Sequence, residues 1–304
     1  MKNNALMHFY MYSNNEVLDL KDYEKYKRLS LNVASLFLSD DELHDRGKLI
    51  EHCGDLIQFD KENNLVSANF CRQRLCPNCQ RRNSLKLYSK FKRIESKLLS
   101  DGFCFAHLVL TCQNCESDEL TKTIKLLYDA SSKFFKDKKV KQGFKGALRC
   151  LEVSYNRTNC NYHPHLHCLI AVKKSYFTSR YYLNREKIAD IWKKCLKIDY
   201  NPQVWITKCD DNALAEVVKY AVKPLELTTS DVVRLSVLKT LHHGLHGRRL
   251  LQTYGIIKEV AKQLNIDLNE EDSDCVSNSD SDEIKTYIFN FNTLKYEQNN
   301  FKLK

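Results

Sequence analysis

Hydrophobic and polar positions along the chain change period several times, which predicts a mixture of helices and strands. Residues 84–99 carry apolar side chains at three- and four-residue steps, the pattern of an amphipathic helix. Residues 146–155 and 165–172 are strand-like runs joined by the polar turn 156–161, so we expect a β-hairpin. Further helices are predicted over 40–49, 117–135, 182–196, 212–222 and 254–264, and further strands over 103–112 and 204–209. Together these elements predict an α+β fold with an antiparallel sheet.

Composition divides the chain into five predicted segments. Residues 1–50 are a mostly helical, polar N-terminal extension, residues 51–83 form a cysteine-rich module, and residues 84–266 hold the main domain. Residues 267–283 (DLNEEDSDCVSNSDSDE) are acidic and serine-rich, so we predict a disordered linker. For the tail 284–304, a strand added to a sheet edge and an unstructured segment are both open.

Charge is spread unevenly over the chain. The formal net charge is +10, yet residues 267–304 carry nine acidic against four basic residues, which leaves +15 on the first 266. This excess of positive charge predicts a polyanionic partner such as nucleic acid. The alternative is a basic soluble protein without such a partner. No apolar run approaches the ~20 residues of a membrane span, and the start lacks a signal-peptide pattern. We therefore expect a cytoplasmic protein with no membrane partner, whose thirteen cysteines are reduced.

The segment NYHPHLHCLIAV predicts a metal site. In a strand, His165 and His167 point to the same face, so both imidazoles can reach one ion. Glu152, on the preceding strand, is the candidate third ligand. His163 is less certain because Pro164 interrupts strand pairing. Imidazole suits Mn²⁺ or Zn²⁺, and carboxylate with water can complete a Mg²⁺ site. The alternative is ordinary hairpin histidines beside a solvent-facing carboxylate.

The cysteine-rich module predicts a structural zinc site. Its Cys-x2-Cys pair has the spacing of a zinc knuckle, and two further cysteines can complete a tetrahedral set: Cys53, Cys71, Cys76 and Cys79. A second pair, Cys112 and Cys115, is a competing source of two ligands. Four neighbouring arginines are candidates for gripping DNA phosphates: Arg72, Arg74, Arg81 and Arg82.

The segment AEVVKYAVKP predicts a helix with Glu216 and Tyr220 on one face and Lys219 and Lys223 one turn apart. A tyrosine so placed can attack a phosphodiester, Glu216 can activate water or accept a proton, and the lysines can hold phosphate. A half-buried core tyrosine with two solvated lysines is the alternative.

A second histidine group lies further along the chain. We interpret it as a polar, phosphate-contacting loop made of His242, His243, His246, Arg248 and Arg249.

These segments, with residues 105–114 (FAHLVLTCQN), resemble the motifs of rolling-circle plasmid replication initiators, of the type found on Gram-positive plasmids. That group belongs to the HUH endonucleases, and the triplet here is His165–Leu166–His167. Glu216, Lys219, Tyr220 and Lys223 match the family's E-x-x-K-Y-x-x-K motif in full. The similarity covers residues 50–268, including LHGRRLLQTYGIIKEVAKQLNID. His107 departs from the plainer first motif of the family, and its contribution to the site is open.

The resemblance implies a sheet of HUH type flanked by helices. It implies that Tyr220 is the nucleophile of a nick at a plasmid origin, aided by Mg²⁺ or Mn²⁺, which leaves a 5′-phosphotyrosine and a 3′-OH primer. Origin DNA, single-stranded DNA, and a host helicase and polymerase are the implied partners. Two alternatives are a zinc-stabilised, non-catalytic DNA-binding regulator and an HUH transposase or relaxase.

Overall fold

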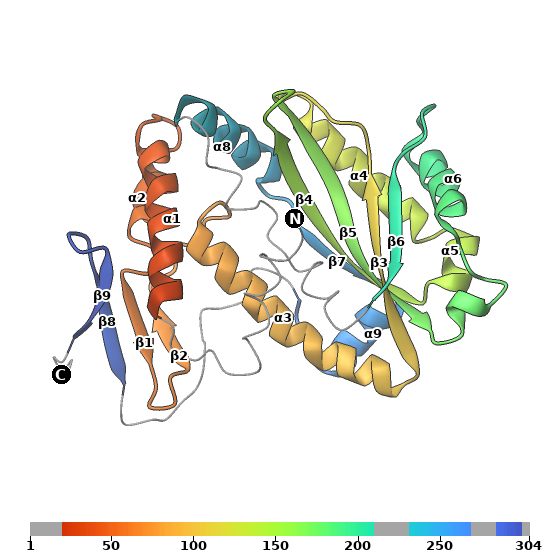
Figure 1. The fold of residues 1–304 in the computed structure, drawn as a ribbon, viewed down its shortest axis with the longest axis horizontal. Helices are drawn as coiled ribbons and strands as arrows, with labels where there is room; N and C mark the ends of the chain where they lie inside the picture. Colours follow the sequence, from red (N-terminus) through yellow and green to blue (C-terminus); the bar gives the residue numbers. More distant parts are fainter. Residues whose placement is uncertain (1–19, 210–230, 269–283, 300–304) are drawn as a thin grey trace. The chain divides into compact units, whose positions relative to one another are not determined.

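The structure is a computed structural model that describes residues 20–209, 231–268 and 284–299 (Figure 1). The chain divides into two compact units, each of which is described by itself. Unit 1 comprises residues 1–83 and 271–304, and unit 2 comprises residues 84–270. The boundary at residue 83 falls within helix α3 (Pro77–Ser100).

Unit 2 is built on a five-stranded sheet with strand order β6-β3-β5-β4-β7. Every pair of neighbouring strands is antiparallel, which confirms the predicted α+β class with an antiparallel sheet. The long hairpin that the sequence predicts forms the centre of this sheet. The hairpin consists of β4 (Gly146–Asn156) and β5 (Asn161–Lys173). The other strands of the sheet are β3 (Phe103–Thr111), β6 (Val204–Lys208) and β7 (Leu251–Tyr254).

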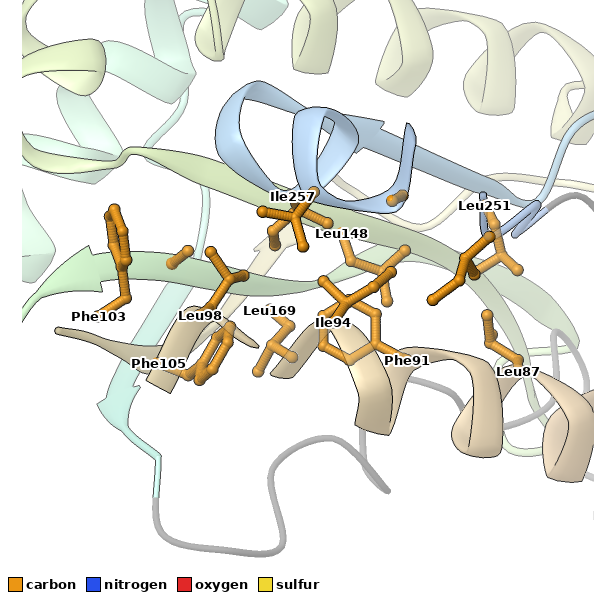
Figure 2. Close-up of a cluster of buried hydrophobic side chains, with 14 of the residues drawn as sticks. Leu87, Phe91, Ile94, Leu98, Phe103, Phe105, Leu148, Leu169, Leu251 and Ile257 are labelled. Carbon is orange, nitrogen blue, oxygen red and sulfur yellow. The ribbon is translucent and has the colours of Figure 1, made fainter. Parts of the chain in front are cut away.

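One face of this sheet packs against α3 and α9 (Gly255–Gln263). Helix α3 presents a stripe of apolar residues at three- and four-residue steps, as its sequence predicts. Figure 2 shows these side chains meeting those of the strands and of α9 in one buried cluster. Its members include Leu87, Phe91, Ile94, Leu98, Phe105, Leu148, Leu169 and Ile257.

The opposite face of the sheet is covered by α4 (Leu120–Phe134) and α6 (Arg185–Leu196) (Figure 1). Trp192 of α6 is fully buried, its ring meets that of Phe134 edge-on at 5.9 Å, and its Nε1 donates to the Thr111 carbonyl at 2.7 Å. The indole thus fixes α6 to both α4 and the end of β3.

Helix α8 (Asp231–Leu245) corrects one interpretation of the sequence. His242 and His243 lie in its last turn, so the predicted loop was wrong for these two residues. His246, Arg248 and Arg249 follow the helix in a turn and irregular chain, as predicted. Leu238, Leu241 and Leu245 are buried along the helix. Gly244 lets α8 approach α4 closely, since a Cβ there would lie 2.8 Å from Leu120.

Unit 1 contains a four-stranded sheet with strand order β2-β1-β8-β9. The C-terminal tail therefore forms strands, the first of the two alternatives that the sequence leaves open. Residues 285–288 pair antiparallel with residues 56–59, more than 200 positions away. The elements are α1 (Leu20–Leu38), α2 (His44–Glu51), β1 (Leu56–Phe59), β2 (Leu65–Ala68), β8 (Lys285–Asn290) and β9 (Lys295–Asn299).

A buried lysine ties the helices of unit 1 to its cysteine segment. Lys27 of α1 is completely buried, and its ammonium donates to the carbonyl oxygens of Glu51 and Cys53. It also forms an ion pair with Asp55. Because an unpaired ammonium is costly to bury, these contacts hold α1 against the turn that carries Cys53.

Among the residues that the structure describes, no helix is both long enough and apolar enough to cross a membrane.

Candidate metal sites

On one face of strand β5, candidate metal ligands lie near the start of the strand and core residues lie farther along it. His165 and His167 alternate with the buried Leu166 and Cys168, so both imidazoles leave the sheet on one side. Farther along, Leu169 continues this face into the apolar cluster under α3. The register places Glu152 of β4 directly opposite His165, so the carboxylate shares the face of the histidines.

Glu152, His165 and His167 bring three ligand atoms together. Glu152 Oε2 lies 3.0 Å from His167 Nε2 and 3.8 Å from His165 Nε2, and the two Nε2 atoms are 3.1 Å apart. Ligands that bind one ion at about 2.1 Å have separations of this size. Two imidazoles and a carboxylate also suit Mn²⁺ or Zn²⁺ and, with water, Mg²⁺. The residues present therefore fit a divalent cation.

Burial keeps the site in a form that can bind metal. His165 is 9% exposed and Glu152 is 3% exposed. Burial lowers the pKa of His165 to about 4, although the Glu152 carboxylate acts in the opposite direction. The imidazole is therefore neutral at neutral pH. His165 Nδ1 lies 3.0 Å from the His163 carbonyl oxygen, which can only accept, so the lone pair is on Nε2, facing the site.

His163 belongs to β5 and lies beside the three ligands without joining them. The strand starts at Asn161 and passes through Pro164, because β3 pairs with β5 only as far as Thr111 and His165. The His163 ring lies beside that of His165, with centroids 5.0 Å apart, and its Nδ1 lies 2.7 Å from Asn114 Oδ1. Burial lowers its pKa.

Unit 1 holds a second cluster, made only of sulfur. The four thiols that converge are those predicted from the sequence: Cys53, Cys71, Cys76 and Cys79. Cys79 Sγ lies 3.6 Å from both Cys53 Sγ and Cys71 Sγ, close to the separation expected around a tetrahedral zinc ion. Within the described part of the chain, Cys112 and Cys115 belong to no such group.

Local structure brings these thiols together from three places. Cys53 follows α2 and precedes Gly54, whose φ of 73° turns the chain, and Cys71 follows β2. Cys76 and Cys79 flank the start of α3, where Pro77 suits the first helical position. Burial raises the pKa of Cys76, but hydrogen bonds from the other three thiols outweigh it and hold that pKa well below its usual value.

Two of the four predicted phosphate-binding arginines are buried, which corrects their assignment. Arg81 is 7% exposed and pairs with Asp22, with Nη2 2.6 Å from Oδ2. Arg82 is 6% exposed and lies over the Phe70 ring at 4.5 Å. Both guanidinium groups pack inside unit 1, whereas Arg72 is exposed and Arg74 is half-buried.

The predicted nucleophile helix, with Glu216, Lys219, Tyr220 and Lys223, lies outside the described residues. Arg248 and Arg249 are described: Arg248 donates to the Thr121 carbonyl at 3.1 Å, and Arg249 is exposed.

Two further residues lie near the histidine ligands: His107, whose contribution the sequence leaves open, and Trp205, which the sequence does not single out. His107 of β3 contacts His167, with Nε2 3.0 Å from Nδ1. Trp205 of β6 is 56% exposed and lies opposite Val109, which in turn lies opposite His167, so the indole shares the face of the ligands. Only the strand register reveals both positions.

The fold and the sites define a class: an α+β protein with a histidine–carboxylate site on an antiparallel sheet and a separate four-cysteine site. The Rep_1 family, described as "Replication protein", matches residues 62–301. The chain belongs to this family, which confirms its resemblance to plasmid replication initiators.

Several curated relatives are similar over most of their length. A "Protein rep" of Streptococcus pneumoniae serotype 2 is 34% identical over 86% of this chain and 85% of its own. A "Protein rep" of Lactiplantibacillus plantarum is 34% identical over 78% and 80%, and one of Staphylococcus aureus is 35% identical over 66% and 93%. No solved structure matches the chain.

Proposed function

We propose that this replication protein nicks one DNA strand at a plasmid origin by tyrosine transesterification and later rejoins or releases it. The observation that carries the proposal is the convergence of Glu152, His165 and His167 on one face of the sheet. A purely structural histidine pair would not need a buried carboxylate 3.0 Å from the Nε2 of one ring. This site and the sheet that carries it support an HUH-type domain over residues 84–266.

Each residue has a separate task in this mechanism. A divalent cation held by Glu152, His165 and His167 would neutralise the scissile phosphate and align it. The Tyr220 oxygen attacks phosphorus, the bond from phosphorus to the 3′ oxygen breaks, and the phenol proton passes to solvent as the 3′-OH forms. The product is a 5′-phosphotyrosine, which keeps the strand available for rejoining. Glu216 activates water or accepts the proton at release, and Lys219 and Lys223 hold phosphate.

The four thiols support a zinc-binding module over residues 51–83. Four cysteine ligands complete a tetrahedral shell and leave no open position, which is the pattern of a structural zinc ion. In this proposal Arg72 and Arg74 contact DNA phosphates beside the zinc, and Arg249, with Arg248, does so in unit 2. Arg81 is excluded because its guanidinium is paired with Asp22.

Trp205 supports a single-stranded substrate. A large indole exposed on a sheet edge offers a platform on which any base can stack. The Arg185 guanidinium lies 5.5 Å from the ring centroid and adds positive charge for the backbone. Because Trp205 shares the face of the metal ligands, a strand stacked there runs toward them. The proposal places the reaction in the cytoplasm, with a host helicase and polymerase acting downstream.

The test is formation of a covalent protein–DNA adduct. The protein would be incubated with Mn²⁺ or Mg²⁺ and end-labelled single-stranded oligonucleotides that tile both strands of its own replicon. We expect one oligonucleotide to yield a denaturant-resistant adduct that requires the cation. Tyr220→Phe should abolish the adduct, and Tyr182→Phe, at an exposed tyrosine of unit 2, should leave it unchanged.

Two results would count against the proposal. An undiminished adduct in Tyr220→Phe would assign the nucleophile elsewhere. Tight DNA binding without any adduct would favour the non-catalytic regulator. Replication of a plasmid carrying the same origin would then distinguish an initiator from a transposase or relaxase.

A further inference from the structure

His107 touches a metal ligand through its ring edge. It lies on β3, diagonally across from His167 of β5, with Val109 directly opposite that ligand. His107 Nε2 is 3.0 Å from His167 Nδ1. The two ring planes differ by only 14° and their centroids are 5.2 Å apart. Rings so far apart do not overlap face to face, so they lie edge to edge and share a hydrogen bond.

The direction of this hydrogen bond decides whether His167 can bind a cation. His167 Nε2 lies 3.0 Å from Glu152 Oε2 and 3.1 Å from His165 Nε2, and to bind a cation held among these groups this nitrogen must carry its lone pair. The proton of the neutral ring is then on Nδ1, which must donate to His107 Nε2. The reverse arrangement, with His107 as donor, would put the His167 proton on Nε2 and block the site.

The tautomer of the other histidine ligand, His165, is fixed by a different kind of partner. His165 Nδ1 donates to the His163 carbonyl, and a carbonyl can only accept, so the tautomer of His165 is fixed by its own strand. His167 has its Nδ1 beside a side chain from another strand. Outer partners of this kind orient metal-binding histidines and set their basicity.

We propose that His107 is a positioning residue that accepts a hydrogen bond from His167 Nδ1–H and thereby presents His167 Nε2 to the catalytic cation. The inference rests on the proposed function, because it needs a cation at the Glu152, His165 and His167 site. It requires His107 itself to carry its proton on Nδ1. A hydrophobic side chain at position 107 could fill the same space but could not accept the hydrogen bond.

The first experiment reads the tautomers in the wild-type protein. Long-range ¹H–¹⁵N spectra of histidine-labelled protein would be recorded without and with Zn²⁺ at the histidine site, zinc being diamagnetic. His167 and His107 would be assigned by the signals lost in single variants. We expect His167 protonated at Nδ1 and shifted at Nε2 by zinc, and His107 protonated at Nδ1. Protonation of His107 at Nε2 in the zinc-loaded protein would overturn the inference.

The second experiment measures Mn²⁺ affinity by titration calorimetry. His107→Phe keeps a planar ring but removes the acceptor, and we expect affinity to fall by about 10- to 100-fold. His107→Gln offers an amide oxygen and should restore affinity to within about threefold of wild type, since the acceptor is what matters. Thr207→Val, at the position opposite His107 on β6, is the matched control and should change nothing.

Glu152→Ala and His165→Ala separate the two possible failures. If both abolish Mn²⁺ binding while His107→Phe binds as wild type does, the positioning role fails and the proposed cation site stands. If neither changes Mn²⁺ binding, the proposed function fails and takes the role of His107 with it. Equal weakening by Phe and Gln at position 107, in variants that unfold at the wild-type temperature, would also overturn the inference.

Discussion

The two candidate metal sites differ in what they leave open. The cysteine site offers four thiols, three of them buried, and four sulfurs complete a tetrahedral shell. The histidine site offers two nitrogens and one carboxylate, so a cation there keeps positions for water or phosphate. In the proposed function, this difference in the number and softness of the ligands separates an ion that holds structure from an ion that meets substrate.

The largest effect is expected at the four-cysteine site, which leaves no open position on a tetrahedral ion. Cys76→Ser removes one thiolate, and since zinc binding to such sites contributes about 10 kcal/mol or more to folding, unit 1 should lose its zinc and its protection from hydrogen exchange. Elemental analysis and exchange mass spectrometry would measure both. Cys104→Ser, at a thiol of unit 2 outside both clusters, is the control. Full zinc content in Cys76→Ser would break the comparison.

A substitution at the histidine–carboxylate site should lower nicking activity without changing the fold. Glu152→Ala removes a ligand worth several kcal/mol in the transition state, so nicking should fall by on the order of 10³-fold. Zinc content and the unfolding temperature of unit 1 should stay at wild-type values. Glu259→Ala, at an exposed carboxylate of α9, is the matched control. A loss of zinc in Glu152→Ala would show that the two sites are not separate.

A smaller effect is expected where Lys27 supports the cysteine segment. Lys27→Met leaves Asp55 and two carbonyl groups without their buried cation, which should destabilise unit 1 by about 3 kcal/mol. Exchange rates and thermal unfolding of the zinc-loaded protein would measure it, with the exposed Lys25→Met as control. Unchanged stability would mean that the zinc ligands alone hold the segment.

The smallest effect concerns DNA binding beside the open site. Trp205→Ala should weaken binding of single-stranded DNA by about 1–3 kcal/mol, while Trp205→Phe should retain most of it. Fluorescence anisotropy would measure the affinity, and quenching of the indole by bound DNA would report contact directly. Leu126→Ala, at an exposed apolar residue of α4, should have no effect. Wild-type affinity in Trp205→Ala would remove the stacking platform from the proposal.

Local patterns predicted much of the fold and of the ligand sets. The alternation in β5 placed His165 and His167 on one face, and the Cys-x2-Cys spacing identified Cys76 and Cys79 as ligands, because both patterns depend on near neighbours in the chain. Helix α8 was not predicted from the sequence, because the polar histidines near its end obscure the helical spacing of the apolar residues Leu238, Leu241 and Leu245.

Contacts between distant segments could not be predicted. The hydrogen bond of His107 depends on the register of β3 against β5, which no periodicity fixes. Arg81 was predicted to bind phosphate because its ion-pair partner, Asp22, lies 59 positions earlier, and no local pattern indicates that the two residues meet.

The sheet of unit 1 has a consequence for synthesis. β1 is made more than 200 residues before its neighbour β8, which consists of residues 285–290, so β1 keeps one bare edge until those residues have been synthesised. A bare edge invites wrong pairing with other chains. A product shortened by a frameshift before residue 285 would keep that edge for good, so the sheet of unit 1 forms only in chains that extend beyond β8.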